Sequence, residues 1–387
     1  MTEAAGFGVY VHWPFCARIC PYCDFNVVRD RGRDAAQSAL AGAILADLKA
    51  QAEPLGRRRL NSIFFGGGTP SLMDPDWAGA IIAAARMLFD AADDLEVTLE
   101  ANPTDAEAAR FAAFAGAGVN RLSLGVQSLD DEALGFLGRN HDAAAARRAA
   151  EIARRAFDRL SIDLIYALPS QTPAAWRAGL TDALTLNPEH VSAYQLTLEP
   201  DTPFDRAVRR GRWAPPQEDA AGALYETTEA VLGAAGFEGY EISNHARCEA
   251  ARSRHNLIYW RGGDYLGVGP GAHGRLTDAD GARWTTLSPA RIADYVRRVE
   301  TAGNGVEERE QLNAVEAAQE RLLMGLRTVE GVALSELAPL QIHPDLIAQL
   351  TTGGLLRGVD DRMIATRRGR AVLDRLTLEL AQSAASG

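Results

Sequence analysis

The sequence predicts an α/β fold, a partial (β/α)6 TIM-like barrel followed by a C-terminal winged-helix-like domain. Over the first 200 or so residues, six short apolar runs alternate with longer Ala- and Leu-rich helical stretches, the pattern of parallel strands joined by crossover helices. From about residue 310, helical periodicity returns and is followed by one apparent hairpin. The length of 387 residues leaves room for such a barrel and additions to it.

The six candidate strands are nearly continuous in apolar residues, as expected when helices cover both faces of a parallel sheet. They are Val9–His12, Ser62–Phe65, Leu95–Leu99, Arg121–Gly125, Ser161–Ile165 and His190–Gln195. The helices between them are expected to begin near residues that satisfy or tolerate the unpaired N–H groups of a first turn. These starts are Asp34, Asp74, Asp105, Asp130, Pro173 and Asp219.

After Phe237 the pattern changes to a stretch that is rich in glycine over residues 261–274, and we expect loops to dominate there. The C-terminal part is expected to contain helices, a hairpin and a last helix, at Val315–Arg327, Leu334–Leu337, Pro344–Leu350, residues 358–361 and from Gly369 onward. We therefore expect three parts: a barrel over residues 1–236, a connecting region over 237–309 and a winged-helix-like domain over 310–387.

Composition and charge exclude several classes of protein. The chain is 47% hydrophobic and 24% charged, which is average for a globular protein. The net charge of −11 provides no global positive field for nucleic acid, and residues 310–387 contain more acidic than basic residues, which favours structural packing over DNA binding. The most apolar helical stretch, Ala78–Leu88, is too short to cross a bilayer. We expect a cytoplasmic protein with no nucleic-acid partner and no integral membrane segment.

Three of the four cysteines lie within eight residues, in a C-x3-C-x2-C pattern after the first candidate strand: Cys16, Cys20 and Cys23. Such clustering suggests a metal site in a reducing compartment rather than disulfides. A structural zinc site needs a fourth ligand, which only Cys248 or a histidine could supply. An iron–sulfur cluster bound by three thiolates instead leaves one iron open to another ligand. On spacing alone both alternatives stay open.

Polar residues follow the next strands, at the end of a barrel where ligand sites are built. They are Gly67, Gly68 and Thr69 in the segment Phe-Phe-Gly-Gly-Gly-Thr-Pro, then Glu100, Gln127, Arg139 and Asp163. Each has an ordinary structural alternative, since Glu100 could cap the following turn and Asp163 could be a paired buried carboxylate. Their joint placement favours one cofactor pocket.

The cysteine segment and its position resemble the radical S-adenosylmethionine (SAM) superfamily, whose signature is this loop after the first strand of a partial barrel. The resemblance implies a [4Fe–4S] cluster held by Cys16, Cys20 and Cys23, with the amino and carboxylate groups of SAM on the fourth iron. It also implies cofactor contacts at Tyr10, Tyr22, Gly67, Gly68, Thr69, Glu100, Gln127, Arg139 and Asp163.

Within the superfamily the chain is similar, over nearly its whole length, to the oxygen-independent coproporphyrinogen oxidase-like group, and in particular to its haem-chaperone branch. In the decarboxylating oxidases Gly-Cys follows the third cysteine, whereas Asp24-Phe25 follows Cys23 here. The resemblance implies a protein that binds haem and transfers it to an unidentified acceptor protein. The alternatives are a radical SAM enzyme that acts on a porphyrinogen and a zinc-stabilised regulatory protein.

The string His-Asn-Leu-Ile-Tyr-Trp at residues 255–260 is typical of the haem-chaperone branch, and the resemblance assigns His255 to haem binding. Imidazole is a natural axial ligand of haem iron. Flat aromatic faces and positive charges for the propionates are close in sequence, at Tyr259, Trp260, Arg252, Arg254 and Arg261. The structural alternative is that His255 and Asn256 cap and cross-link a loop. Cys248 is expected to be a packing residue, and His273 has no assigned role.

Overall fold

In the computed structural model, which describes residues 5–32 and 34–383, a 12-stranded sheet has the order β14-β13-β12-β11-β1-β4-β5-β6-β7-β8-β10-β9. Its six central strands pair in parallel. They are β1 (Phe7–Trp13), β4 (Arg59–Gly67), β5 (Asp90–Ala101), β6 (Arg121–Gln127), β7 (Arg159–Tyr166) and β8 (His190–Gln195). Each contains one of the six predicted strands, so the α/β class and the partial barrel are confirmed.

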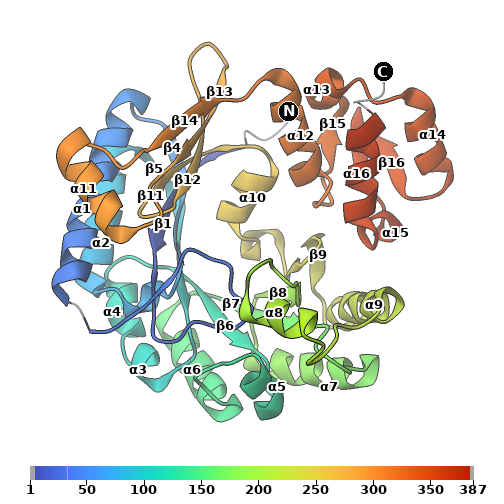
Figure 1. The fold of residues 1–387 in the computed structure, drawn as a ribbon, viewed down its shortest axis with the longest axis horizontal. Coiled ribbons are helices and arrows are strands. Elements are labelled where there is room, and N and C mark those ends of the chain that lie inside the picture. The colour runs from blue at the N-terminus through green and yellow to red at the C-terminus, as the bar shows by residue number, and fades with distance from the viewer. Residues whose placement is uncertain (1–4, 33, 384–387) are drawn as a thin grey trace.

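Helices cover the outer face of the barrel sheet (Figure 1). They are α1 (Asp34–Ala52), α2 (Pro75–Leu88), α3 (Asp105–Ala108), α4 (Phe111–Gly116), α5 (Asp131–Phe136), α6 (Ala143–Ala156), α7 (Pro173–Ala183) and α9 (Glu218–Ala234). Helix α8 (Pro203–Arg209) instead contacts the cysteine segment, because the Phe204 amide donates to the carbonyl of Pro21 at 3.0 Å. One helix was expected after Asp130, but two are present. The reason is Gly138, whose φ of +68° ends the first helix and turns the chain back toward the sheet. Short 310 turns lie at Glu53–Leu55, Pro70–Leu72 and Leu184–Leu186.

The segment expected to consist mainly of loops forms further strands and helices. They are β9 (Glu238–Glu241), β10 (Asn244–Ala246), a 310 turn (Glu249–Ala251), α10 (Arg254–Trp260), β11 (Asp264–Val268), β12 (His273–Thr277), β13 (Arg283–Leu287), α11 (Ile292–Ala302) and β14 (Glu308–Gln311). Strand β11 extends the parallel part of the sheet by pairing with β1. The glycines allow this close packing, because a Cβ on Gly267 would lie 2.0 Å from the His273 carbonyl oxygen.

The C-terminal part has its own hydrophobic core, which contains Leu322, Leu350 and Leu376. Its elements are α12 (Ala314–Gly325), β15 (Val332–Ala333), α13 (Leu334–Leu337), a 310 turn (Ala338–Leu340), α14 (Pro344–Thr352), β16 (Leu356–Val359), β17 (Arg362–Ala365), α15 (Arg367–Arg370) and α16 (Leu373–Ser383). The helices and the β16–β17 hairpin lie where they were predicted, beyond one edge of the barrel (Figure 1). The division at residues 236 and 309 stays a prediction.

No helix within residues 5–32 and 34–383 has both the length and the apolar character needed to cross a bilayer.

Candidate functional site

The three clustered cysteines lie on a loop that is closed by two short parallel strands, β2 (Phe15–Cys16) and β3 (Val28–Arg29). The amide of Asp30 donates to the carbonyl of Cys16 at 2.7 Å, and the amide of Cys23 donates to the carbonyl of Cys20 at 3.2 Å. Burial raises the pKa of the Cys16 thiol and raises that of Cys23 to about 11, and the neighbouring cysteines add to both shifts. The loop therefore gathers three thiols that need a positive partner in order to ionise.

Two side chains donate hydrogen bonds to these sulfur atoms. Thr69 Oγ1 lies 3.5 Å from Cys16 Sγ, and Arg139 Nη1 lies 3.2 Å from Cys20 Sγ. No three Cys, His, Asp or Glu side chains in the described ranges are close enough together to hold one metal ion. The cysteine sulfur atoms that hold an iron–sulfur cluster lie farther apart than those that bind one metal ion, because each cysteine binds a different iron. The donor set thus fits an iron–sulfur cluster better than a preformed zinc site.

Arg139 connects the cysteine loop to the ends of the strands. Its Nη1 lies 3.4 Å from the Tyr22 hydroxyl, and its Nη2 donates to the carbonyl of Gly125 at 3.1 Å and to Asn102 Oδ1. Asn102 Nδ2 in turn donates to Thr69 Oγ1 at 3.0 Å. Sequence reasoning missed Asn102, which joins two predicted site residues through contacts that only the fold creates.

Glu100 and Asp163 form an acidic wall at the carboxyl ends of β5 and β7. Burial and the neighbouring charge of Asp163 raise the pKa of Glu100 to about 8, although the Gly67 amide donates to it. Burial also raises the pKa of Asp163, and Ser123 Oγ donates to both of its carboxylate oxygens at 3.2 Å. The positive charge of Arg121 lowers both pKa values but does not offset burial, which remains the largest cause of each shift. Because the pKa of each carboxyl group stays raised, the wall favours a positively charged ligand.

A polar pocket of about 430 Å³ opens between this wall and the cysteine loop. Its lining is Tyr10, His12, Asp24, Phe25, Asn26, Gly67, Glu100, Gly271 and His273. The Tyr10 hydroxyl lies 3.0 Å from His12 Nδ1, whose other ring nitrogen lies 2.8 Å from the Asn26 carbonyl oxygen. His12 was missed by sequence reasoning. Its position two residues after Tyr10, on the same face of a strand, was the available signal.

The other residues that the sequence predicted for the cofactor site fall into two groups, those that line this pocket and those that lie beside the cysteines. The Gln127 Oε1 atom is buried without a hydrogen-bond partner in the described structure, which leaves it available to a ligand donor. Gly68 instead packs on the cysteine loop, because a Cβ there would lie 2.7 Å from the Pro14 carbonyl carbon. Tyr10, Gly67 and Glu100 thus line the pocket, while Tyr22, Thr69 and Arg139 surround the cysteines.

His255 is not among the residues that line this pocket, and its ring stacks on the ring of Tyr10, which does line it, with 6.3 Å between the ring centroids. The residue is 1% exposed, and its ring nitrogens Nδ1 and Nε2 lie 2.8 Å from Ser62 Oγ and 2.6 Å from the Tyr259 hydroxyl. Burial lowers the pKa of the ring to about 3. The assignment of His255 to haem stays a prediction. In the structure the Tyr259 hydroxyl is hydrogen-bonded to His255 Nε2, so Tyr259 would have to move before this nitrogen could bind haem iron.

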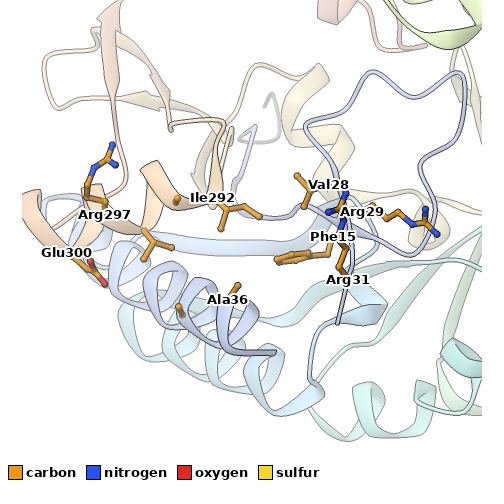
Figure 2. A pocket seen from close by; sticks show the side chains of 11 residues that line it. Phe15, Val28, Arg29, Arg31, Ala36, Ile292, Arg297 and Glu300 are labelled. Atoms are coloured by element: carbon orange, nitrogen blue, oxygen red, sulfur yellow. The ribbon is translucent and has the colours of Figure 1, made fainter. Parts of the chain in front are cut away.

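A second, larger pocket of about 610 Å³ lies on the other side of the cysteine loop, between that loop, α1 and α11 (Figure 2). Its floor is apolar and includes Phe15, Val28 and Ile292. Arg29 and Arg31 also line it, and neither forms an ion pair with any residue that the structure describes. An apolar floor with free positive charge beside it fits an amphipathic anion.

Comparisons with known proteins agree with this site. A family model described as the radical SAM superfamily matches residues 10–180. The chain is 41% identical over 390 residues to the Bos taurus protein named radical S-adenosyl methionine domain-containing protein 1, mitochondrial, covering 96% of this chain and 86% of that protein. It is 36% identical over 392 residues to the heme chaperone HemW of Escherichia coli (strain K12), covering 98% and 99%.

Among solved structures, that of coproporphyrinogen III oxidase (HemN) from Escherichia coli matches with a TM-score of 0.79 at 22% sequence identity. The match covers 97% of this chain and 90% of that one, and at this identity it shows a shared fold.

Proposed function

Because the chain belongs to the radical SAM superfamily, within its oxygen-independent coproporphyrinogen oxidase-like group, we propose that it is a haem chaperone that carries a [4Fe–4S] cluster and SAM and transfers haem to an acceptor protein. The observation that carries the proposal is the identity of 36% to a protein named heme chaperone HemW, across 98% of this chain and 99% of that protein. The acceptor is not identified, and the cytoplasmic location stays a prediction.

The residues at the carboxyl end of the barrel support the cluster and SAM. Cys16, Cys20 and Cys23 would hold three irons, and the Arg139 guanidinium would stabilise the Cys20 thiolate to which it already donates. When bound, the cluster supplies an open iron for the amino and carboxylate groups of SAM. The positive charges of SAM suit the acidic wall made by Glu100 and Asp163.

Haem is the cargo in this proposal. The arginines expected to meet its propionates already have partners: Arg254 Nη2 lies 2.6 Å from Asp94 and Arg261 Nη2 lies 2.7 Å from Glu330. Haem bound near residues 252–261 would therefore have to compete with existing ion pairs as well as with the Tyr259 hydroxyl.

The second candidate is a radical SAM enzyme that acts on a porphyrinogen. The observation in its favour is the polar pocket, where Tyr10, Gly67 and Glu100 line one cavity close to the cysteine loop. In that case the cluster and SAM would serve radical chemistry on a substrate rather than haem carriage.

One anaerobic experiment separates the two candidates. Reconstituted protein is incubated with dithionite, SAM and coproporphyrinogen, and 5′-deoxyadenosine and decarboxylated product are measured beside a Cys20→Ala control. In parallel, ferric haem is titrated and the Soret band is recorded. The chaperone proposal expects haem binding without product, whereas product above the control would favour the enzyme. Zinc without iron or acid-labile sulfide would overturn both in favour of a zinc protein.

A further inference from the structure

We propose that haem, the cargo of the proposed function, is held in the pocket of about 610 Å³ beside the cysteine loop, with its propionates on Arg29 and Arg31. The inference rests on the proposed haem binding and names the surface on which the porphyrin lies. Sites for small molecules commonly measure about 300–1,000 Å³, so the pocket has the size that such a ligand needs. None of its lining residues was assigned a role from the sequence.

Three elements supply the apolar part of the pocket. Phe15 and Val28 pair with each other across β2 and β3 and form the side that belongs to the cysteine loop. On α11, Ile292 and Val296 are one helical turn apart and therefore lie on the same face of the helix. The lining residues of α1 are small, Ala39 among them, which leaves space above the helix. Val28 is 37% exposed, and an exposed apolar surface with charges at its edge is typical of a binding site.

Free positive charge is concentrated at one end of this pocket. Arg29 and Arg31 are two residues apart, and neither side chain has an ion pair with any residue that the structure describes. Figure 2 shows both at the end formed by the cysteine loop, whereas Arg297 and Glu300 lie at the other end, where Arg297 is paired with Asp294 at 2.7 Å. Haem carries two propionates on one edge of its ring, and two neighbouring guanidinium groups suit them. Since the chain has a net charge of −11, a dianion needs such local positive charge in order to bind.

The arginines near the motif at residues 255–260 provide a comparison. Arg254 and Arg261 are held in ion pairs by acidic side chains 2.6 and 2.7 Å away, and a propionate must break these pairs to reach them. The two arginines of the pocket lose no partner when a propionate binds. Arg29 also pairs with Cys16 in the β2–β3 ladder, so its backbone is fixed by the loop that carries the cysteines. A backbone that is fixed in advance lowers the entropic cost of binding.

The pocket holds the porphyrin without a protein ligand to the iron. None of its lining residues, all of which the structure describes, is a His, Cys, Met or Tyr, the side chains that usually bind haem iron. Binding therefore depends on the apolar face and the propionates, so iron-free protoporphyrin IX should bind as tightly as haem. Ala36 and Ala293 at the rim are exposed, which leaves part of the ring open to an acceptor protein. Such a site suits a carrier, because release requires no exchange of an iron ligand.

The test uses the anaerobically reconstituted full chain, with iron-free protoporphyrin IX as the probe and its fluorescence as the readout. Arg29→Ala and Arg31→Ala are each expected to lower the affinity by about tenfold, as loss of a charge-assisted hydrogen bond does, and lysine at both positions should restore part of it. Ala39→Glu puts a negative charge on the apolar surface at an exposed helical position and should also weaken binding by about tenfold. Arg86→Ala removes an exposed arginine of α2 outside the pocket and is the matched control. Iron content and circular dichroism check that each variant is folded.

The outcomes separate the inference from the proposed function. If the wild type binds ferric haem but not the iron-free porphyrin, an iron ligand holds the ring and the inference is wrong, while haem binding stays in place. Wild-type affinity in Arg29→Ala, Arg31→Ala and Ala39→Glu would overturn the inference in the same way. Displacement of the porphyrin by an equal concentration of oleate would overturn it in favour of an acyl carboxylate as the occupant. Absence of haem binding by the wild type would overturn both proposals.

Discussion

Replacing Glu100 with glutamine removes one of the two negative charges of the acidic wall and keeps the shape of the side chain. Burial, followed by repulsion from Asp163, raises the pKa of Glu100 from 4.5 to about 8 in the folded chain. Below pH 4.5 both the folded and the unfolded chain hold the proton. Between pH 4.5 and 8 the unfolded chain releases it and the folded chain does not, so stability falls as pH rises through this window and levels off above pH 8.

The magnitude follows from the same pKa difference. At 1.36 kcal/mol for each pKa unit, the rise from 4.5 to about 8 corresponds to at most about 5 kcal/mol. Glu100 borders the polar pocket, where water can reach it, and water lowers the cost of the charge. We therefore expect Glu100→Gln to be about 1–3 kcal/mol more stable than the wild type above pH 8 and similar to it near pH 4.5.

Urea unfolding of the cluster-free protein at several pH values measures this difference directly. Glu132→Gln, at an exposed position on α5, is the control and should show no pH-dependent difference from the wild type. If the Glu100→Gln variant is less stable than the wild type at high pH, the conclusion that burial and the charge of Asp163 destabilise ionised Glu100 is wrong. The positive charge of SAM should lower the pKa of Glu100, so Glu100 should release its proton when SAM binds at neutral pH. Calorimetry of SAM binding in buffers with different ionisation enthalpies detects this proton release.

Three further predictions concern other parts of the chain. Gly67→Ala should weaken SAM binding about tenfold, because the backbone φ at this position is +101° and the new methyl group would lie 2.4 Å from the His12 ring. Equilibrium dialysis measures this loss, and Gly42→Ala, where nothing lies within 4 Å of the new methyl group, is the control. Glu96→Ala should cost about 3–5 kcal/mol in urea unfolding, since it leaves a buried ion pair broken, and a loss below about 1 kcal/mol would contradict the buried network. Leu322→Ala should cost about 2–5 kcal/mol and raise hydrogen exchange mainly in residues 314–383, whereas Leu323→Ala, at a half-exposed position, should have little effect.

Local sequence patterns were enough to predict the barrel. The six apolar runs are all strands, because a strand that is buried on both faces needs continuous apolar residues whatever its neighbours are. The residues at the carboxyl ends were also predictable, since parallel strands bring their ends to one edge. The strand β11 was not predicted, because it lies within a glycine-rich stretch that resembles a loop, and its pairing with β1 and β12 depends on the fold. The contacts of Asn102 likewise depend on α5 ending at Phe136, which brings Arg139 to the strands.

The motif at residues 255–260 shows where resemblance and geometry give different information. Three of its apolar side chains, Leu257, Ile258 and Trp260, are buried, and its histidine bonds two hydroxyl groups. Helix α10 contacts β1, β4 and β11, so the motif packs against the barrel at the level of Ser62, away from the cysteine loop. Packing alone can therefore account for these residue types, and haem ligation is an additional role that a family resemblance assigns to His255.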